Sequence, residues 1–135
     1  MNDPQKGVTI KMDKFLIISV GAILGANARY WLGGWAAERF GTTFPYGTLI
    51  INVSGSLILG FFITLITERF LVDPRWRLFV AIGFLGAYTT FSTYTYESVN
   101  LIMSGQVWLG LLDLFGSSII GAAAVMAGIL LGRAF

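Results

Sequence analysis

A run of hydroxyl, aromatic and acidic side chains lies inside one of the apolar parts of this chain. Between Gly83 and Glu97 the sequence reads GFLGAYTTFSTYTYE, so two glycines precede hydroxyls and aromatic rings that end in a carboxylate. Helical periodicity predicts two neighbouring stripes, one of Thr90, Thr93 and Glu97 and one of Phe91, Tyr94 and Ser98. A polar stripe beside an aromatic one indicates a lined path.

Two further segments carry polar or small residues at steps of about four, which place them on one face of a helix. These faces are Thr48, Asn52, Ser56 and Gly60, and Asp113, Ser117, Gly121 and Ala124. They offer hydroxyl and amide donors without a Lys or Arg. Such donors hold an anion that has lost its water, or they join helices by ordinary hydrogen bonds, and the pattern alone favours neither. It assigns no role to Asp113.

The overall composition excludes most other chemistry. The chain has 135 residues, 56% of them apolar and 12% charged, with no cysteine and no histidine. The usual thiolate nucleophile, metal ligands and neutral-pH base are missing, so we expect no enzyme. A net charge of +2, with basic residues scattered near segment ends, is not typical of a nucleic-acid-binding protein. A soluble domain carries about 25% charge, so a lipid bilayer is the expected surrounding of this chain.

Four apolar stretches are long enough to cross a bilayer as helices, which takes about 20 residues each. They are residues 15–35, 48–67, 76–103 and 107–131. Because the links between them are short, we predict a single all-α membrane domain over residues 1–135 with four transmembrane helices.

The third stretch is too long for an unbroken span. Its roughly 28 residues would form a helix of about 42 Å, against a hydrocarbon thickness of about 30 Å. A break near residues 86–90 resolves both the excess length and the polarity, and broken helices in membranes expose carbonyls that bind small cations. A tilted helix made flexible by its glycines is the alternative.

Glycine pairs predict close helix packing. Gly21 with Gly25, and Gly128 with Gly132, have the small-xxx-small spacing that lets two helix backbones approach. Four short spans bury few residues per chain, so we also expect a homo-oligomer whose interface is part of the fold.

The basic residues are distributed unequally between the two ends of the predicted spans. One end has Lys6, Lys11, Lys14, Arg69, Arg75, Arg77 and Arg133, and the other has Arg29 and Arg39. By the positive-inside rule, this bias places both termini in the cytoplasm.

Three separate motifs resemble the Fluc family of small fluoride channels of microbial membranes. They are GANARY at residues 25–30, PYGTLIIN at residues 45–52 and GFLGAYTTFST at residues 83–93. The resemblance covers essentially the whole chain. It implies a multi-pass protein of the cell inner (plasma) membrane that forms an antiparallel, dual-topology homodimer with two fluoride pores. Dual topology requires a nearly balanced charge bias and so conflicts with the positive-inside count, but three ordered motifs carry more weight.

The resemblance also implies roles for individual residues. The expected fluoride pore contains Asn52, Phe91 and Tyr94, with Thr48, Ser92, Thr93, Glu97 and Ser117 along its polar track and Arg29 near its entrance. The backbone carbonyls of Gly86 and Thr89 would hold a structural sodium ion at the dimer centre.

Two polar groups near this pore need a separate explanation. The family usually has a second phenylalanine where this chain has Tyr94, whose hydroxyl would donate to fluoride or turn to a partner such as Glu97. We expect a changed conduction rate before a loss of selectivity. A carboxylate beside an anion path repels the anion, so we expect Glu97 to accept hydrogen bonds from Tyr94, Thr93 or the backbone and to orient neighbouring hydroxyls.

The sequence therefore predicts a passive channel that exports cytoplasmic fluoride down its electrochemical gradient and gives fluoride resistance. A small four-span, proton-coupled multidrug exporter is the alternative, although such a protein needs a carboxylate in its first span and residues 15–35 contain none. A third possibility is a membrane assembly subunit whose polar faces only join helices.

Overall fold

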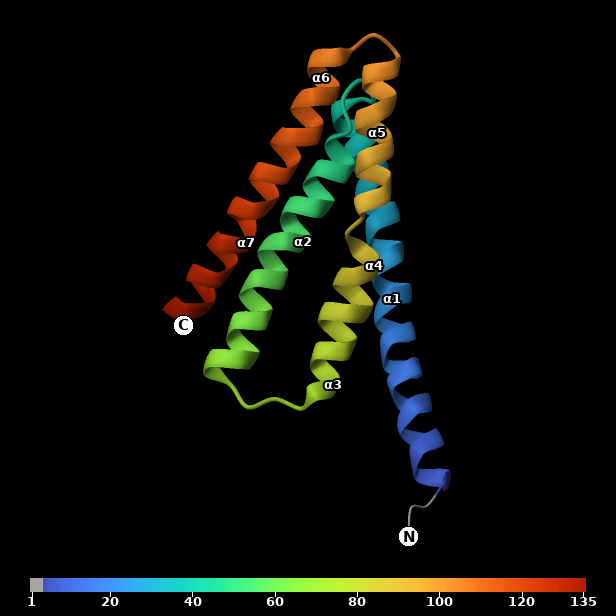
Figure 1. Ribbon diagram of the computed structural model, residues 1–135, viewed down its shortest axis with the longest axis vertical. Coiled ribbons are helices and arrows are strands. Elements are labelled where there is room, and N and C mark those ends of the chain that lie inside the picture. Colours follow the sequence, from blue (N-terminus) through green and yellow to red (C-terminus); the bar gives the residue numbers. More distant parts are fainter. Residues whose placement is uncertain (1–3) are drawn as a thin grey trace.

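Helices joined by short links make up the part of the chain that the computed structural model describes, which is the backbone of residues 4–135 and the side chains of residues 11–135 (Figure 1). The helical elements in chain order are α1 (Pro4–Phe40), α2 (Tyr46–Thr64), the π-helical turn η1 (Leu65–Arg69), α3 (Pro74–Trp76), the π-helical segment η2 (Arg77–Leu85), α4 (Gly86–Tyr88), α5 (Phe91–Met103), α6 (Val107–Leu111), the π-helical turn η3 (Leu112–Gly116) and α7 (Ser117–Ala134). The predicted all-α class is confirmed. Lys6, one of the residues in the charge count, lies outside the described side chains.

Three helices in the described residues are long and apolar enough to cross a membrane. They are Lys11–Phe40, Tyr46–Arg69 and Val107–Ala134, with mean hydropathies of 1.4, 2.3 and 2.1. The remaining helical material is in two shorter pieces, since the helix from α3 to α4 ends at Tyr88 and α5 begins at Phe91. α5 alone has 13 residues and rises only about 20 Å, which is less than a hydrocarbon core.

The first helix is much longer than hydropathy predicts, because helix formation does not stop where hydrophobicity does. We expected a span over residues 15–35, whereas α1 runs from Pro4 to Phe40. Proline is favoured at the first helical position, where its missing N–H is not needed. At the other end Gly41 has φ +82°, the left-handed conformation in which glycine commonly ends a helix.

The helices run back and forth between two ends of the molecule (Figure 1). The start of α1, the link 70–73 and the end of α7 are directed toward one end, the lower one in the view, and α1 extends furthest. The links 41–45 and 104–106 lie at the other. The most basic segments therefore share one end of the described structure.

Close packing occurs in pairs of helices, while much of the outer surface remains apolar. α2 packs along α7, α1 packs against η2 and α4, and α5 packs against α6. A small core of Ile51, Leu85 and Tyr88 lies where α1, α2 and α4 meet. Trp31 is 71% exposed, and large apolar side chains are exposed along every long helix, which is the surface expected of a protein surrounded by lipid or by another subunit.

Glycines occupy the points of closest approach between helices. Cβ atoms at Gly21 and Gly25 would collide with backbone atoms of Phe79 and Phe84. At Gly132 a Cβ atom would lie 2.8 Å from Thr64 Cβ, and at Gly128 it would meet the carbonyl oxygen of Leu57. The prediction that these glycine pairs allow close helix packing is confirmed.

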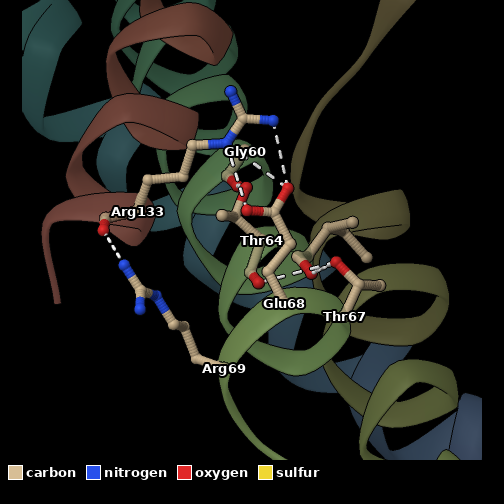
Figure 2. A network of polar contacts seen from close by, with 7 residues as sticks. Gly60, Thr64, Thr67, Glu68, Arg69 and Arg133 are labelled. Carbon is tan, nitrogen blue, oxygen red and sulfur yellow. Dashed lines mark hydrogen bonds and ion pairs between the residues drawn. The ribbon is translucent and has the colours of Figure 1, made fainter.

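An ion pair and a side-chain-to-backbone hydrogen bond join the end of α7 to the end of η1 (Figure 2). The Arg133 guanidinium donates to the Glu68 carboxylate, with Nε to Oε2 at 3.1 Å and Nη2 to Oε1 at 3.1 Å. Arg69 in turn donates to the carbonyl oxygen of Arg133. Thr64, one helical turn before Glu68, donates its hydroxyl to Gly60 O at 2.8 Å and so stays within its own helix. The two helices that pack most extensively are thus also joined at their ends.

Gly25→Ala should destabilise the protein, because the added methyl group meets the backbone of Phe84 rather than a movable side chain. We expect the free energy of unfolding in detergent to fall by about 1–3 kcal/mol, the usual cost of overpacking. Gly34→Ala is the matched control on the same helix, since a Cβ atom there meets nothing within 4 Å. It should leave stability unchanged or raise it by up to about 1 kcal/mol through helix propensity. Equal losses for both variants would contradict this assignment.

Candidate functional site

Two residues with extended backbone separate α4 from α5. Thr89 has φ −79° and ψ 156°, and Thr90 has φ −148° and ψ 123°. Gly55 on α2 makes room for this segment, since a Cβ atom there would collide with the side chain of Thr89. Extended backbone away from water needs hydrogen-bond partners outside its own helix.

Asn52 supplies those partners. Its Nδ2 donates to Thr90 O at 2.9 Å, and its Oδ1 accepts from Thr90 N at 2.8 Å. One side chain on α2 therefore satisfies both backbone groups of the central extended residue, much as a neighbouring strand would.

The same extended segment leaves two backbone carbonyls without the N–H donors that a continuous helix would provide. In a continuous α-helix the N–H of Thr90 would donate to Gly86 O, and the N–H of Thr93 would donate to Thr89 O. Here the first N–H donates to Asn52, and the second donates to the side chain of Thr90 at 3.2 Å, as at a helix N-cap. The carbonyls of Gly86 and Thr89 thus lose their helical donors.

Two cavities meet at Thr90, which lines both of them. The first, here called the Asn52 cavity, has a volume of about 440 Å³ and lies between α2, α4, α5 and α7. The second, here called the Glu97 cavity, has a volume of about 600 Å³ and lies between α1, the start of α2, α5 and the link 41–45. The Asn52–Thr90 contact stands at their boundary.

The predicted site residues divide between these two cavities. The Asn52 cavity is lined by Asn52, Gly86, Thr89, Phe91, Tyr94 and Ser117. The Glu97 cavity is lined by Arg29, Thr48, Thr93 and Glu97. Ser92 lines neither cavity and is exposed on α5. All ten of the other predicted site residues line one of the two cavities. Nine of them come from five helices, α1, α2, α4, α5 and α7, and Thr89 comes from the extended segment, so no single helical face contains the site.

Glu97 is an acceptor, but its donor differs from those predicted. Its Oε1 accepts from the Thr48 hydroxyl at 3.0 Å, which joins α5 to α2. Its Oε2 is buried and has no hydrogen-bond partner among the described residues. Neither Tyr94 nor Thr93 donates to it, because Thr93 faces the Thr90 hydroxyl at 3.0 Å and Tyr94 points elsewhere.

The Tyr94 hydroxyl turns toward α7 and η3. It donates to Leu114 O and lies 2.7 Å from Ser118 Oγ. The ring is only 7% exposed, whereas the Phe91 ring, 5.9 Å away between centroids, is 78% exposed. The two aromatic side chains of the predicted pair therefore have different surroundings in this chain.

Three polar residues at this site were not among the predicted site residues, although Thr90 and Ser98 belonged to the two predicted stripes. Thr90 caps α5 and lines both cavities, Ser118 lies beside Tyr94, and Ser98 donates to Asp113 Oδ2 at 2.6 Å. The four-residue step from Asp113 to Ser117 was a usable signal, since Ser117 donates to Asp113 Oδ1 at 2.9 Å. The partnership with Ser98, fifteen residues earlier, carries no such signal.

Comparison with known proteins decides the family. Residues 16–129 match the family described as CrcB-like protein, Camphor Resistance (CrcB). The chain belongs to this family.

Relatives of this CrcB-family chain carry the name Fluoride-specific ion channel FluC. One from Sulfurihydrogenibium sp. is 50% identical over 125 residues, which covers 90% of this chain and 98% of the relative. One from Trichormus variabilis is 49% identical over 125 residues, with 87% of each chain covered, and one from Koribacter versatilis is 49% identical over 113 residues, covering 84% of this chain and 90% of the relative. The resemblance to the Fluc family is confirmed. With its three long apolar helices, this CrcB-family chain is an integral membrane protein.

Asn52→Ala should loosen the extended segment, because Thr90 N and Thr90 O lose their partners together. A fully buried polar group left unpaired costs about 1–3 kcal/mol, and Thr90 is partly buried, so we expect a loss of unfolding free energy toward the lower end of this range and faster amide hydrogen exchange at Thr90. Asn27→Ala is the control, since Asn27 is exposed and donates only to Ile23 O within its own helix. Unchanged exchange at Thr90 in the Asn52 variant would contradict the role given to this side chain.

Proposed function

We propose that this chain forms a passive channel that lets cytoplasmic fluoride leave the cell down its electrochemical gradient. One observation carries the proposal beyond the names of its relatives. Two cavities meet at an extended backbone segment between half-helices, and their polar lining consists of hydroxyls, the amides of Asn52 and Asn100, aromatic rings and the hydrogen-bonded carboxylate of Glu97. Neither cavity has a Lys side chain, and the one Arg among the lining residues, Arg29, belongs to the Glu97 cavity.

This lining suits a small and strongly hydrated anion. A filter for fluoride has to replace water molecules at short range, and hydroxyl and amide groups approach closely because they are compact. Ring edges carry the positive part of the aromatic quadrupole, so Phe91 adds attraction without a formal charge. A cationic side chain at the narrowest point would hold the ion too firmly for rapid release. Arg29 lines the Glu97 cavity and not the Asn52 cavity, a position that suits a cation attracting anions at an entrance.

A second copy of the chain completes the channel in this proposal. The Phe91 ring is 78% exposed on the single chain, and Gly86 beside the extended segment is exposed as well. Non-helical backbone survives at membrane depth only where protein or a watery cavity surrounds it. An antiparallel homodimer would cover this region and make α3 to α5 one interrupted third span out of four. Short links at both ends leave both orientations of the chain sterically open.

A sodium ion at the centre of such a dimer fits the oxygen ligands that the chain provides. The carbonyls of Gly86 and Thr89 have lost their helical donors, and oxygen ligands are those that small hard cations prefer. Four carbonyls, two from each copy, would then face one point. The ion would act as a structural crosslink between the half-helices, without taking part in the passage of the anion.

Fluoride efflux from liposomes tests the channel. Reconstituted protein should release fluoride far faster than chloride, without a proton gradient or nucleotide. Phe91→Ala should slow fluoride efflux by at least about ten-fold, on the scale of one lost favourable contact at the rate-limiting point. Phe115→Ala is a matched control, because Phe115 is 61% exposed and lines neither cavity. Absence of fluoride-selective flux from correctly folded protein would overturn the proposal, and equal losses for the two variants would overturn the role of Phe91.

Labelling of single cysteines tests the antiparallel assembly. The chain has no native cysteine, so Thr42→Cys in the link 41–45 and Val72→Cys in the link 70–73 report one end each. In plasma-membrane vesicles an impermeant maleimide should label about half of the copies at each position, since each orientation exposes one end. The excess of basic residues at the end that carries Arg75 and Arg77 predicts the opposite result, in which only Thr42→Cys is labelled from outside. That outcome would exclude an antiparallel dimer.

A further inference from the structure

Asp113 is a buried carboxylate that the proposed ion path does not use directly. It is 2% exposed within the apolar helix Val107–Ala134, and it is not among the residues that line either cavity. Its two oxygens are held by two serine hydroxyls, Ser98 on α5 and Ser117 at the start of α7. The described Lys and Arg side chains form no ion pair with it. A π-helical turn, a feature that often marks functional sites, contains this residue.

The hydrogen atoms of this cluster can be assigned from its geometry. Each serine hydroxyl has one hydrogen to donate. If Asp113 is ionised, Ser98 donates to Oδ2 and Ser117 donates to Oδ1. If Asp113 is protonated on Oδ2, it donates to Ser98 Oγ, and Ser98 passes its own hydrogen to Tyr94 O, which lies 3.0 Å away. Ser98 has this second acceptor, whereas the Ser117 hydroxyl contacts only Asp113 among the described residues, so a proton on Asp113 belongs on Oδ2 and the hydrogen of Ser117 points at Oδ1 in both states.

Ser117 has a different position from Ser98, because it borders the Asn52 cavity. With its hydrogen committed to Asp113, its oxygen presents only lone pairs to that cavity. We propose that Asp113 is a positioning residue that fixes the Ser117 hydroxyl as a hydrogen-bond acceptor, so that this wall holds fluoride through one of its hydration waters instead of binding it directly. This inference rests on the proposed function, since it concerns the path of the same anion.

A water molecule meets both requirements of such a wall. It donates one hydrogen to Ser117 Oγ and the other to the anion, so the anion keeps part of its hydration shell at this level. The cavity volume of about 440 Å³ exceeds the share of one liquid water, about 30 Å³, many times over. The neighbouring hydroxyls have no spare hydrogen for the anion either, because the contacts among Tyr94, Ser118 and Leu114 O use the two hydrogens that Tyr94 and Ser118 carry. Direct donors to a stripped anion therefore have to lie elsewhere on the path.

The dependence of fluoride current on fluoride concentration separates this role from a structural one. Ser117→Ala alone removes the oxygen that accepts from the hydration water, so it should raise the half-saturating concentration about two-fold; loss of a direct donor to the anion would raise it about five-fold. Asp113→Asn should also stay within about two-fold, since its Nδ2 donates to Ser98 and its Oδ1 still accepts from Ser117. Asp113→Leu releases the Ser117 hydrogen and should lower the half-saturating concentration about five-fold. Adding Ser117→Ala to that variant should remove the change.

Three results would overturn the inference. The first is a rise of about five-fold or more for Ser117→Ala alone, which would make Ser117 a direct donor. The second is an Asp113→Leu variant that folds and conducts with an unchanged half-saturating concentration, which would leave Asp113 a structural role only. The third is an infrared carboxyl band of Asp113, identified as the band lost in Asp113→Asn, that Ser117→Ala does not shift. The infrared result needs no current, so it decides the hydroxyl direction even if Asp113→Leu does not fold. Absence of current from the parent protein would instead overturn the proposed function.

Discussion

The paired hydrogen bonds between Asn52 and the backbone of Thr90 are the contact on which the rest of the site depends. An α-helix satisfies its own backbone, and that is why helices cross membranes. Once two residues leave the helix, their polar groups need partners from other elements. A primary amide is the side chain that provides one donor and one acceptor at the right separation, and α2 carries it to the place where α4 ends. The two cavities meet where Asn52 replaces the helical backbone as the hydrogen-bond partner of Thr90, and the carbonyls of Gly86 and Thr89 lose their helical donors at the same place.

The same contact explains why the surrounding helices have to pack closely. Asn52 reaches Thr90 only if α2 lies against the extended segment, and Gly55 gives the segment that space. α1 must also approach η2, which Gly21 and Gly25 allow. In lipid, where helices gain little from hiding apolar surface from one another, such close backbone contact and interhelical hydrogen bonds supply much of the association energy. Small residues thus allow two helix backbones to come close, and polar residues form hydrogen bonds between the helices at that short separation.

Hydropathy was enough to predict the helical class and the approximate position of the long helices. It could not predict where α1 begins, because nothing between Pro4 and Phe15 stops the helix at the bilayer surface. Periodicity grouped Thr48 with Asn52 and Ser56 on one face, yet the structure divides them between two cavities. The hydrogen-bond partners predicted for Glu97 and Tyr94 were wrong, and the reason is physical. The sequence shows neighbours within one helix, whereas Thr48 and Leu114 reach these side chains from other helices. The π-helical turns, which rotate later residues around the axis, follow from no propensity in the sequence.

The two ends of the chain are held very differently, and this has a practical consequence for handling the protein. α1 has 37 residues and is about 55 Å long, so it extends well beyond a hydrocarbon core of about 30 Å. The last turn of α7 is tied to its neighbour by the Glu68–Arg133 ion pair and by the edge-to-face contact of Phe135 with Phe61. A fluorescent protein or affinity tag attached before Pro4 is therefore separated from the packed helices by the protruding first part of α1. The same tag attached after Phe135 begins at a ring that contacts Phe61 and only two residues after the ion pair of Arg133.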